Sequence, residues 1–315
     1  MIRLVRVELQ RLAARRLVKL LLVLLLVALV STAAVQGWQS NRDVAGARAK
    51  AEQAAAGISI PPDAIAQCET EAKAQHVPPE ALRCRPVAAD FYHDPRLVYA
   101  TNAPLFANGG VGLGLAFTGI VAIGVIGAEW AAGTFAALLL WEPRRRRVLV
   151  AKLAAVSLTG AAVTAAMAAA FTAVAAAIAA TRGSMAGRIG AATHIAVLHG
   201  ARGVLVAALL AIVVGSLAVV VRSTAGALGV VAIYAIVVEN VVRAWRPHWT
   251  RWQLGPNLIA LISGRLDLEP VGSAPGSGPQ QLFRLSGGRA GMYLVALAIV
   301  AAGCAAVFLQ RRDVT

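Results

Sequence analysis

The sequence predicts an all-α polytopic membrane protein with six transmembrane helices. Hydrophobic residues make up 58% of the 315 residues and the mean hydropathy is +0.69, two values that a water-soluble domain seldom combines. Six apolar stretches also reach the length of about 20 residues that a helix needs to cross a bilayer. They cover residues 19–38, 106–128, 148–180, 203–221, 226–242 and 291–309, within a membrane domain that we assign to residues 17–315.

Three of these stretches have individual features. The first is long enough to remain as an anchor, and no convincing cleavage pattern follows it. The third, residues 148–180, is long enough to tilt or to extend beyond the bilayer. The fifth is short and carries Glu239 near one end, with Arg243 one helical turn away, which predicts a local ion pair at the rim. Cys304 lies within the last stretch and is expected to be a small buried apolar residue.

The distribution of basic residues predicts which side of the membrane each loop faces. An even number of spans places both termini on one side. Basic residues occupy about one position in four of segments 1–19, 129–152, 221–225 and 310–315, but about one in nine of the other connecting segments. We therefore expect both termini to be cytoplasmic, although the connection 181–202 carries three arginines and no acid. The net charge of +15 is explained by this topology and by anionic lipid headgroups, so no nucleic-acid partner is expected.

Two long loops are expected outside. The first, residues 39–105, is large enough for a small subdomain and contains Cys68 and Cys84. A disulfide between them would persist in that compartment, and the alternative is two free thiols. The second outer loop, residues 243–290, contains an apolar segment at 253–264 that is too short to span and is expected to be re-entrant or interfacial.

Residues 1–16 precede the first span and predict an amphipathic helix on the inner membrane surface. Ile2, Val5, Leu9 and Leu12 recur at helical spacing, while most arginines of this segment fall elsewhere. The alternative is a plain basic flank that only fixes topology.

The segment Gly127–Leu153, which we call the elbow, is the most informative part of the chain. Glu129 and Glu142 bracket an apolar run of about a dozen residues, too short to span but suited to an interfacial helix. Pro143 and four consecutive arginines, Arg144–Arg147, follow directly. The part of the elbow expected in the cytoplasm is residues 129–147. It can transmit force between a membrane domain and a cytoplasmic partner. Alternatively, the arginines only fix topology, and Gly133 and Thr134 serve helix packing.

Several kinds of chemistry have no signature in the sequence. No GxxxxGK[ST] phosphate loop occurs, and no catalytic arrangement or metal-ligand spacing stands out, so we expect neither an enzyme nor a metal site. No midplane carboxylate suggests a proton- or sodium-coupled carrier. The glycines at 109, 110, 112 and 114 open the second span without a strand before them, so close helix packing is the better interpretation.

The elbow, GAEWAAGTFAALLLWEPRRRRVLVAKL, resembles the Gly-x-Glu-x-x-x-Gly-Thr…Leu-Leu…Pro-x-x-Arg…Lys pattern of ABC-2 type permeases, most closely the actinobacterial branch. These proteins are the membrane subunits of ATP-binding cassette exporters. The segments VELQRLAARRLVKL, FYHDPRLVY and RSTAGALGVVAIYAIVVE are similar to other parts of the family, whereas the middle of the first outer loop matches no pattern.

The resemblance implies a six-helix half-transporter of the plasma membrane that works as a dimer, with a second copy of itself or a related permease. Two separate ATPase subunits would bind ATP and Mg²⁺, so this chain would need no cofactor. In the family, a coupling element between the second and third helices docks on the ATPase. The resemblance assigns to this element Glu129, Gly133, Thr134, Trp141, Glu142, Pro143 and Arg144. The substrate and the residues that contact it are not identified by the sequence.

Two other functions compete with the exporter. The chain could be a non-transporting module that couples a cytoplasmic ATPase to an extracytoplasmic partner, which the large first outer loop would suit. It could also be a secondary carrier, which would transport without any ATPase but lacks a suitable buried carboxylate.

Overall fold

The computed structural model describes residues 1–76, 78, 84–85, 87–141, 144–268 and 283–311. Six helical segments within these residues are long and apolar enough to cross a membrane: α2 (Arg16–Gln39), α6 (Tyr99–Ala131), α8 (Arg145–Thr181), α9 (Ile189–Val221), the segment Thr224–Trp245 and α13 (Gly287–Arg311). The predicted fold class, an all-α membrane protein with six spanning helices, is confirmed. The fourth helix begins at Ile189, so much of the connection expected at 181–202 is helical.

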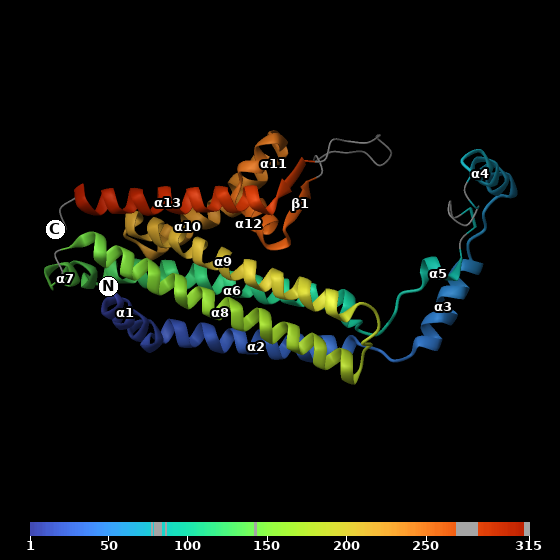
Figure 1. Ribbon diagram of the computed structural model, residues 1–315, viewed down its shortest axis with the longest axis horizontal. Helices are drawn as coiled ribbons and strands as arrows, with labels where there is room; N and C mark the ends of the chain where they lie inside the picture. The colour runs from blue at the N-terminus through green and yellow to red at the C-terminus, as the bar shows by residue number, and fades with distance from the viewer. Residues whose placement is uncertain (77, 79–83, 86, 142–143, 269–282, 312–315) are drawn as a thin grey trace. The chain divides into compact units, whose positions relative to one another are not determined.

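The chain forms two compact units, each described here by itself. Unit 1 comprises Met1–Val30, Ala103–Ala173 and Gly190–Thr315, and unit 2 comprises Ser31–Asn102 and Val174–Ile189. Within unit 1, both chain ends lie at the same end of the helices as α7 (Thr134–Trp141), as Figure 1 shows. We call this the terminal end of unit 1, and the end that carries α12 (Leu254–Ser263) the distal end.

Close packing of α6 on α8 forms the centre of unit 1. Gly110 and Gly114 are buried, and a Cβ at Gly114 would lie 2.6 Å from the Cα of Thr164 on α8. Gly160 of α8 makes the reciprocal approach, since its Cβ would lie 2.6 Å from the side chain of Thr118. The predicted packing role holds for Gly110 and Gly114. It is wrong for Gly112, which has open space around it.

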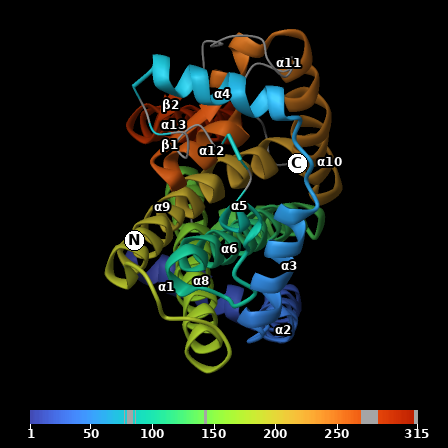
Figure 2. The ribbon, with the colours of Figure 1, turned by 90° about the vertical axis from the view of Figure 1, so that its right-hand side faces the viewer.

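The distal end of unit 1 is organised by α12. The fifth span is not a uniform α-helix: α10 (Thr224–Ile233) continues through a π-helical turn, η1 (Tyr234–Val238), into α11 (Glu239–Trp245). A 3₁₀ segment, η2 (Pro247–Trp252), then leads into α12. The strands β1 (Arg265–Leu268) and β2 (Phe283–Ser286) pair antiparallel and connect α12 to α13. Figure 2 shows α12 beside α13, where it joins a core cluster with Val206 of α9.

Glu239 caps α12, which corrects the predicted ion pair with Arg243. One carboxylate oxygen of Glu239 accepts the backbone N–H of Gly255 at 2.7 Å, and the hydroxyl oxygen of Tyr234 accepts the N–H of Leu254 at 3.0 Å. The first N–H groups of a helix lack partners within the helix, and its positive dipole end favours a carboxylate. Tertiary contact with a helix fifteen residues further along the chain therefore outcompetes the local i, i+4 pairing.

Unit 2 contains α3 (Val44–Ala56), α4 (Pro62–Ala74), α5 (Ala88–Phe91) and the ends of three spans. The Asp-Pro-Arg stretch forms a turn in which Asp94 accepts hydrogen bonds from the side chain and the backbone N–H of Arg96. The side-chain hydrogen bond from Arg96 lowers the pKa of Asp94 below its usual value. The carbonyl oxygen of Leu97, which follows, accepts the backbone N–H of Ser184 at 2.9 Å, and the carbonyl oxygen of Ser184 accepts the N–H of Tyr99 at 3.0 Å.

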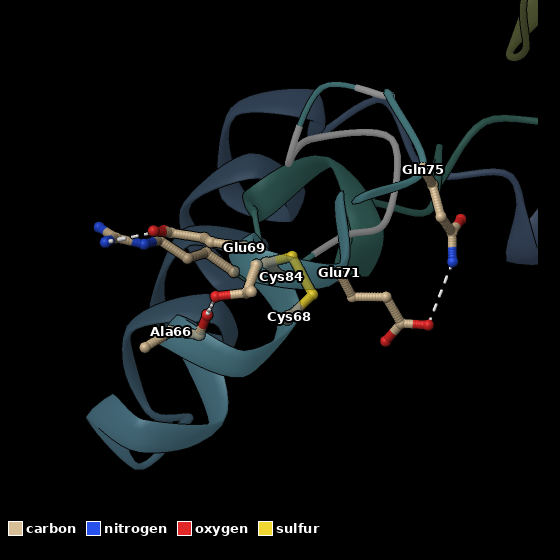
Figure 3. Close-up of a disulfide and its surroundings, with 8 residues drawn as sticks. Ala66, Cys68, Glu69, Glu71, Gln75 and Cys84 are labelled. Carbon is tan, nitrogen blue, oxygen red and sulfur yellow. Dashed lines mark hydrogen bonds and ion pairs between the residues drawn. A yellow bond between two sulfur atoms is a disulfide. The ribbon is translucent and has the colours of Figure 1, made fainter. Parts of the chain in front are cut away.

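Cys68 of α4 and Cys84 are joined by a disulfide in the structure, with their Cα atoms 5.5 Å apart (Figure 3). The two cysteines are 16 positions apart in the sequence, so the bond ties Cys84 to α4.

We predict that Cys68→Ser exposes Cys84 as a reactive thiol. Intact cells would be labelled with a membrane-impermeant maleimide, with Cys68→Ser/Cys84→Ser as the matched control. The single variant should gain labelling that the double variant lacks, because the bond partner is gone and this loop is proposed to face outward. Equal labelling of the wild type and the single variant would contradict the disulfide.

Cys304 lies on the exposed face of α13, so its predicted burial within the chain is wrong. The helix is apolar on more than one face, and a sequence pattern cannot tell which of these faces meets protein. Exposed apolar residues are also numerous on α2, where Val23 is 60% and Leu24 54% exposed. Such faces are expected where lipid replaces water as the solvent.

Candidate functional site

The elbow begins where α6 ends, at a tight turn made by Gly133 and Thr134. Gly133 has a φ angle of +67°, in the left-handed region that L side chains rarely adopt. Its N–H donates to the carbonyl oxygen of Trp130 at 3.1 Å. The Thr134 hydroxyl donates to the carbonyl oxygen of Glu129 at 3.2 Å, so the first residue of α7 satisfies the end of α6.

Four charged side chains meet beside this turn, and we call them the charge cluster: Glu8, Arg15, Glu129 and Lys152. The Lys152 ammonium lies 2.5 Å from one oxygen of Glu129 and 3.1 Å from Glu8, and Arg15 pairs with the other oxygen of Glu129. Glu8 belongs to α1 (Ile2–Ala14), Glu129 to α6 and Lys152 to α8, while Arg15 lies between α1 and α2. The cluster therefore joins the N-terminal helix to both arms of the elbow.

The charge cluster is almost completely withdrawn from solvent. The side chains of Lys152, Glu8 and Glu129 are only 4%, 6% and 8% exposed, and that of Arg15 is 29% exposed. Two carboxylates and two cations balance, so each buried charge has an opposite partner. Removing one member of such a group strands an unpaired buried charge, which is far more costly than losing a surface ion pair.

Aromatic contacts extend the cluster across the terminal end of unit 1. Trp130 of α6 stacks on Phe135 of α7 with ring centroids 4.4 Å apart, and Lys152 lies 5.7 Å from the Phe135 centroid. On the other side, the Arg222 guanidinium lies 4.5 Å from the Trp130 ring and 5.4 Å from that of Phe308 on α13. Phe135 at the start of α7 thus contacts Trp130 of α6 and Lys152 of α8, and Arg222 of the α9–α10 connection links Trp130 to Phe308 near the end of α13.

The elbow residues predicted from sequence occupy different environments. Glu129 is buried, so it holds the elbow from inside and its carboxylate is not available to a docking partner. Arg144 is exposed and precedes α8. Trp141 is the last residue of α7. Glu142 and Pro143 lie outside the described residues.

The arginines at the start of α8 divide into two kinds. Arg145 donates to the carbonyl oxygen of Leu309 at 2.8 Å, and Arg146 donates to the side-chain oxygen of Gln310 at 3.1 Å, so both attach α8 to the end of α13. Arg144 and Arg147 are exposed side chains on the same turn.

Glu8, Arg15 and Lys152 were not predicted as site residues. The signal available was that Glu8 is the single acid in residues 1–16 and Lys152 is a lone charge within an apolar stretch. Lone charges of this kind need partners in a membrane protein. Nothing in one sequence shows that residues 144 positions apart pair with each other.

The arrangement is suited to mechanical coupling. In the described part of the chain, no group of three His, Cys, Asp or Glu side chains could hold a metal ion. What the site offers is a short helix, α7, fixed at its base by buried ion pairs and stacked rings.

Comparisons with curated proteins and with solved structures gave no match. A family model does match, over residues 6–314, which is nearly the whole chain and includes the elbow, the charge cluster and all six spans. Its description, ABC-2 family transporter protein, agrees with the resemblance carried by the elbow and with the six membrane-spanning helices. The chain belongs to the ABC-2 family of transporter proteins.

Proposed function

We propose that this chain is the permease subunit of an ATP-driven exporter in the plasma membrane, coupled through α7 to separate ATPase subunits. The observation that carries the proposal is the charge cluster, which joins α1, α6 and α8 beside the turn where α7 begins. In the assembled complex, two permease chains would work with two ATPases, and ATP and Mg²⁺ would bind only to the latter. Closure of the ATPases would push on the two elbows and rock the two membrane halves.

The proposed orientation places both termini and the elbow in the cytoplasm. Three observations support it: the basic residues concentrate in the segments near the elbow, both chain ends lie at the terminal end (Figure 1), and the disulfide lies in the connection between the first and second spans. An elbow on that side would be accessible to a cytoplasmic ATPase, and the substrate would leave toward the side of the disulfide-bonded loop.

We predict that Arg144→Glu weakens ATPase binding without affecting the fold. The side chain is exposed, so its reversal changes the surface that would meet the ATPase but no internal contact. Tagged protein would be purified in mild detergent from its native host, and co-purifying proteins that carry a phosphate-loop motif would be quantified by mass spectrometry. Recovery should fall about two- to fivefold, the range for losing or reversing one exposed charge pair.

The matched control is Arg243→Glu, the same charge reversal at an exposed site near the distal end. It should leave ATPase recovery unchanged. If no phosphate-loop protein accompanies the wild type, even after crosslinking at the elbow, the proposed partnership is wrong. Equal losses in both variants would show that α7 is not the docking element.

A second function is favoured by unit 2, a compact disulfide-bonded unit with helices of its own. In that alternative, the chain couples the ATPase to an extracytoplasmic partner and moves no substrate. The two functions differ in one measurement. Proteoliposomes containing the purified complex should show ATP-dependent substrate flux if the chain is a permease, and nucleotide-dependent binding of the outer partner without flux if it is a coupling module.

A further inference from the structure

An open groove of about 660 Å³ runs along the exposed face of α13 near the terminal end of unit 1. Its lining residues recur at helical spacing, so they form one stripe: Val300, Gly303, Cys304, Val307, Phe308 and Arg311. Gly303 leaves open space in the middle of the stripe, because a Cβ there would meet nothing within 4 Å. The groove is apolar along most of its length and ends at a cation, Arg311.

A second cation adjoins the same end. The Arg222 guanidinium lies 5.4 Å from the centre of the Phe308 ring, and Phe308 lines the groove. Within the described residues, the Nε and Nη2 atoms of Arg222 are buried and have no hydrogen-bond partner. Aromatic rings hold this guanidinium in place but do not neutralise its charge. The apolar groove thus ends at Arg311, and Arg222 lies behind Phe308 at the same end.

We propose that the groove binds an anionic phospholipid, with an acyl chain along Val300–Val307 and the headgroup phosphate near Arg311 and Arg222. A free phosphate would use the arginines but leave the apolar stripe empty, whereas a neutral lipid would use the stripe but not the arginines. A lipid with an anionic headgroup satisfies both. Because Arg222 also contacts Trp130 at the base of the elbow, a bound lipid would steady the elbow from the α13 side.

Cys304 provides a direct probe of occupancy, since it lines the groove and is the free cysteine of the chain. Purified, delipidated protein in nonionic detergent would be supplemented with either dioleoyl-phosphatidylglycerol or dioleoyl-phosphatidylcholine. The rate of Cys304 alkylation by N-ethylmaleimide would be measured, and retained lipids would be counted by native mass spectrometry. Phosphatidylglycerol should slow alkylation more than phosphatidylcholine, by about fivefold in apparent affinity for each arginine that contributes.

Two variants separate the headgroup from the chain. Arg311→Gln should remove most of the preference for phosphatidylglycerol while leaving weak protection by either lipid. Gly303→Phe should fill the groove and abolish retention of both lipids, whereas Gly288→Phe, at the other end of α13 and equally open, should change neither. These expectations do not depend on the proposed exporter function, because neither an ATPase nor a transported substrate enters the assay.

Three results would overturn the proposal. Equal protection by the two lipids would remove the role of the arginines. Unchanged retention in Gly303→Phe would place the lipid elsewhere on the protein. Protection of Cys304 that rises with protein concentration, together with Cys304–Cys304 crosslinks between copies, would show that a second chain covers this face instead.

Discussion

Lys152→Met is expected to be the most damaging single substitution in the terminal end of unit 1. The ammonium bridges Glu8 and Glu129, and all three side chains are less than a tenth exposed. Removing it leaves Glu129 paired with Arg15, and leaves Glu8 with Arg11, which lies 3.4 Å away and has a side chain that is 52% exposed. Breaking a buried ion pair from one side typically costs about 3–5 kcal/mol, because the remaining charge has neither water nor a counter-ion.

The measurement is the apparent melting temperature of the purified protein in one detergent, followed by fluorescence-detected size exclusion. Lys152→Met should melt well below the wild type. Lys19→Met, an exposed lysine near the start of α2, is the matched control and should melt close to the wild type.

Charge balance gives a sharper test of the same cluster. Adding Glu8→Gln to Lys152→Met leaves the pair Arg15–Glu129 electrically neutral, so the double variant should be more stable than the single variant. If the loss in Lys152→Met came from packing alone, the second substitution would lower stability further. A double variant less stable than Lys152→Met would therefore contradict the charge cluster as described.

The parts of the fold that the sequence predicts are those that depend on local pattern. Hydropathy over about 20 residues is enough to identify six spans. In lipid, the backbone N–H and C=O groups of a spanning segment must be paired, and a helix pairs them within the segment itself. The turn at Gly133–Thr134 was not predicted, although a glycine near the end of an apolar helix is a signal for such a turn. What the sequence did not reveal are contacts across the bundle, such as Lys152 with Glu8, which depend on how the helices pack.

Glu239 illustrates the same limit. Its spacing to Arg243 is ideal for a local pair, yet its carboxylate caps α12. The π-helical turn just before it changes the direction in which residues of the fifth span point, and such turns leave little trace in a hydropathy pattern. Local rules describe a helix in isolation, whereas the unpaired N–H groups of a neighbouring helix end are stronger competitors for a carboxylate.

The second large effect on stability is expected at Gly114 of α6, and Gly112, two residues away, provides the control. We predict that Gly114→Ala destabilises the protein, because the new Cβ would lie 2.5 Å from the Thr164 hydroxyl oxygen and 2.6 Å from the Thr164 Cα. A side chain can rotate away, but the Cα belongs to the backbone of α8, so the two helices must separate. Overpacking of this kind costs about 1–3 kcal/mol.

Gly112→Ala adds the same methyl group to the same helix where nothing lies within 4 Å, and it should melt at or slightly above the wild-type temperature. Adding Thr164→Ala to Gly114→Ala should not restore stability, because the contact with the Thr164 Cα remains. Rescue by that second change would mean that only the hydroxyl was in the way. Equal melting of the Gly112 and Gly114 variants would show that α6 and α8 do not pack closely here, and the elbow at their shared end would lose its rigid base.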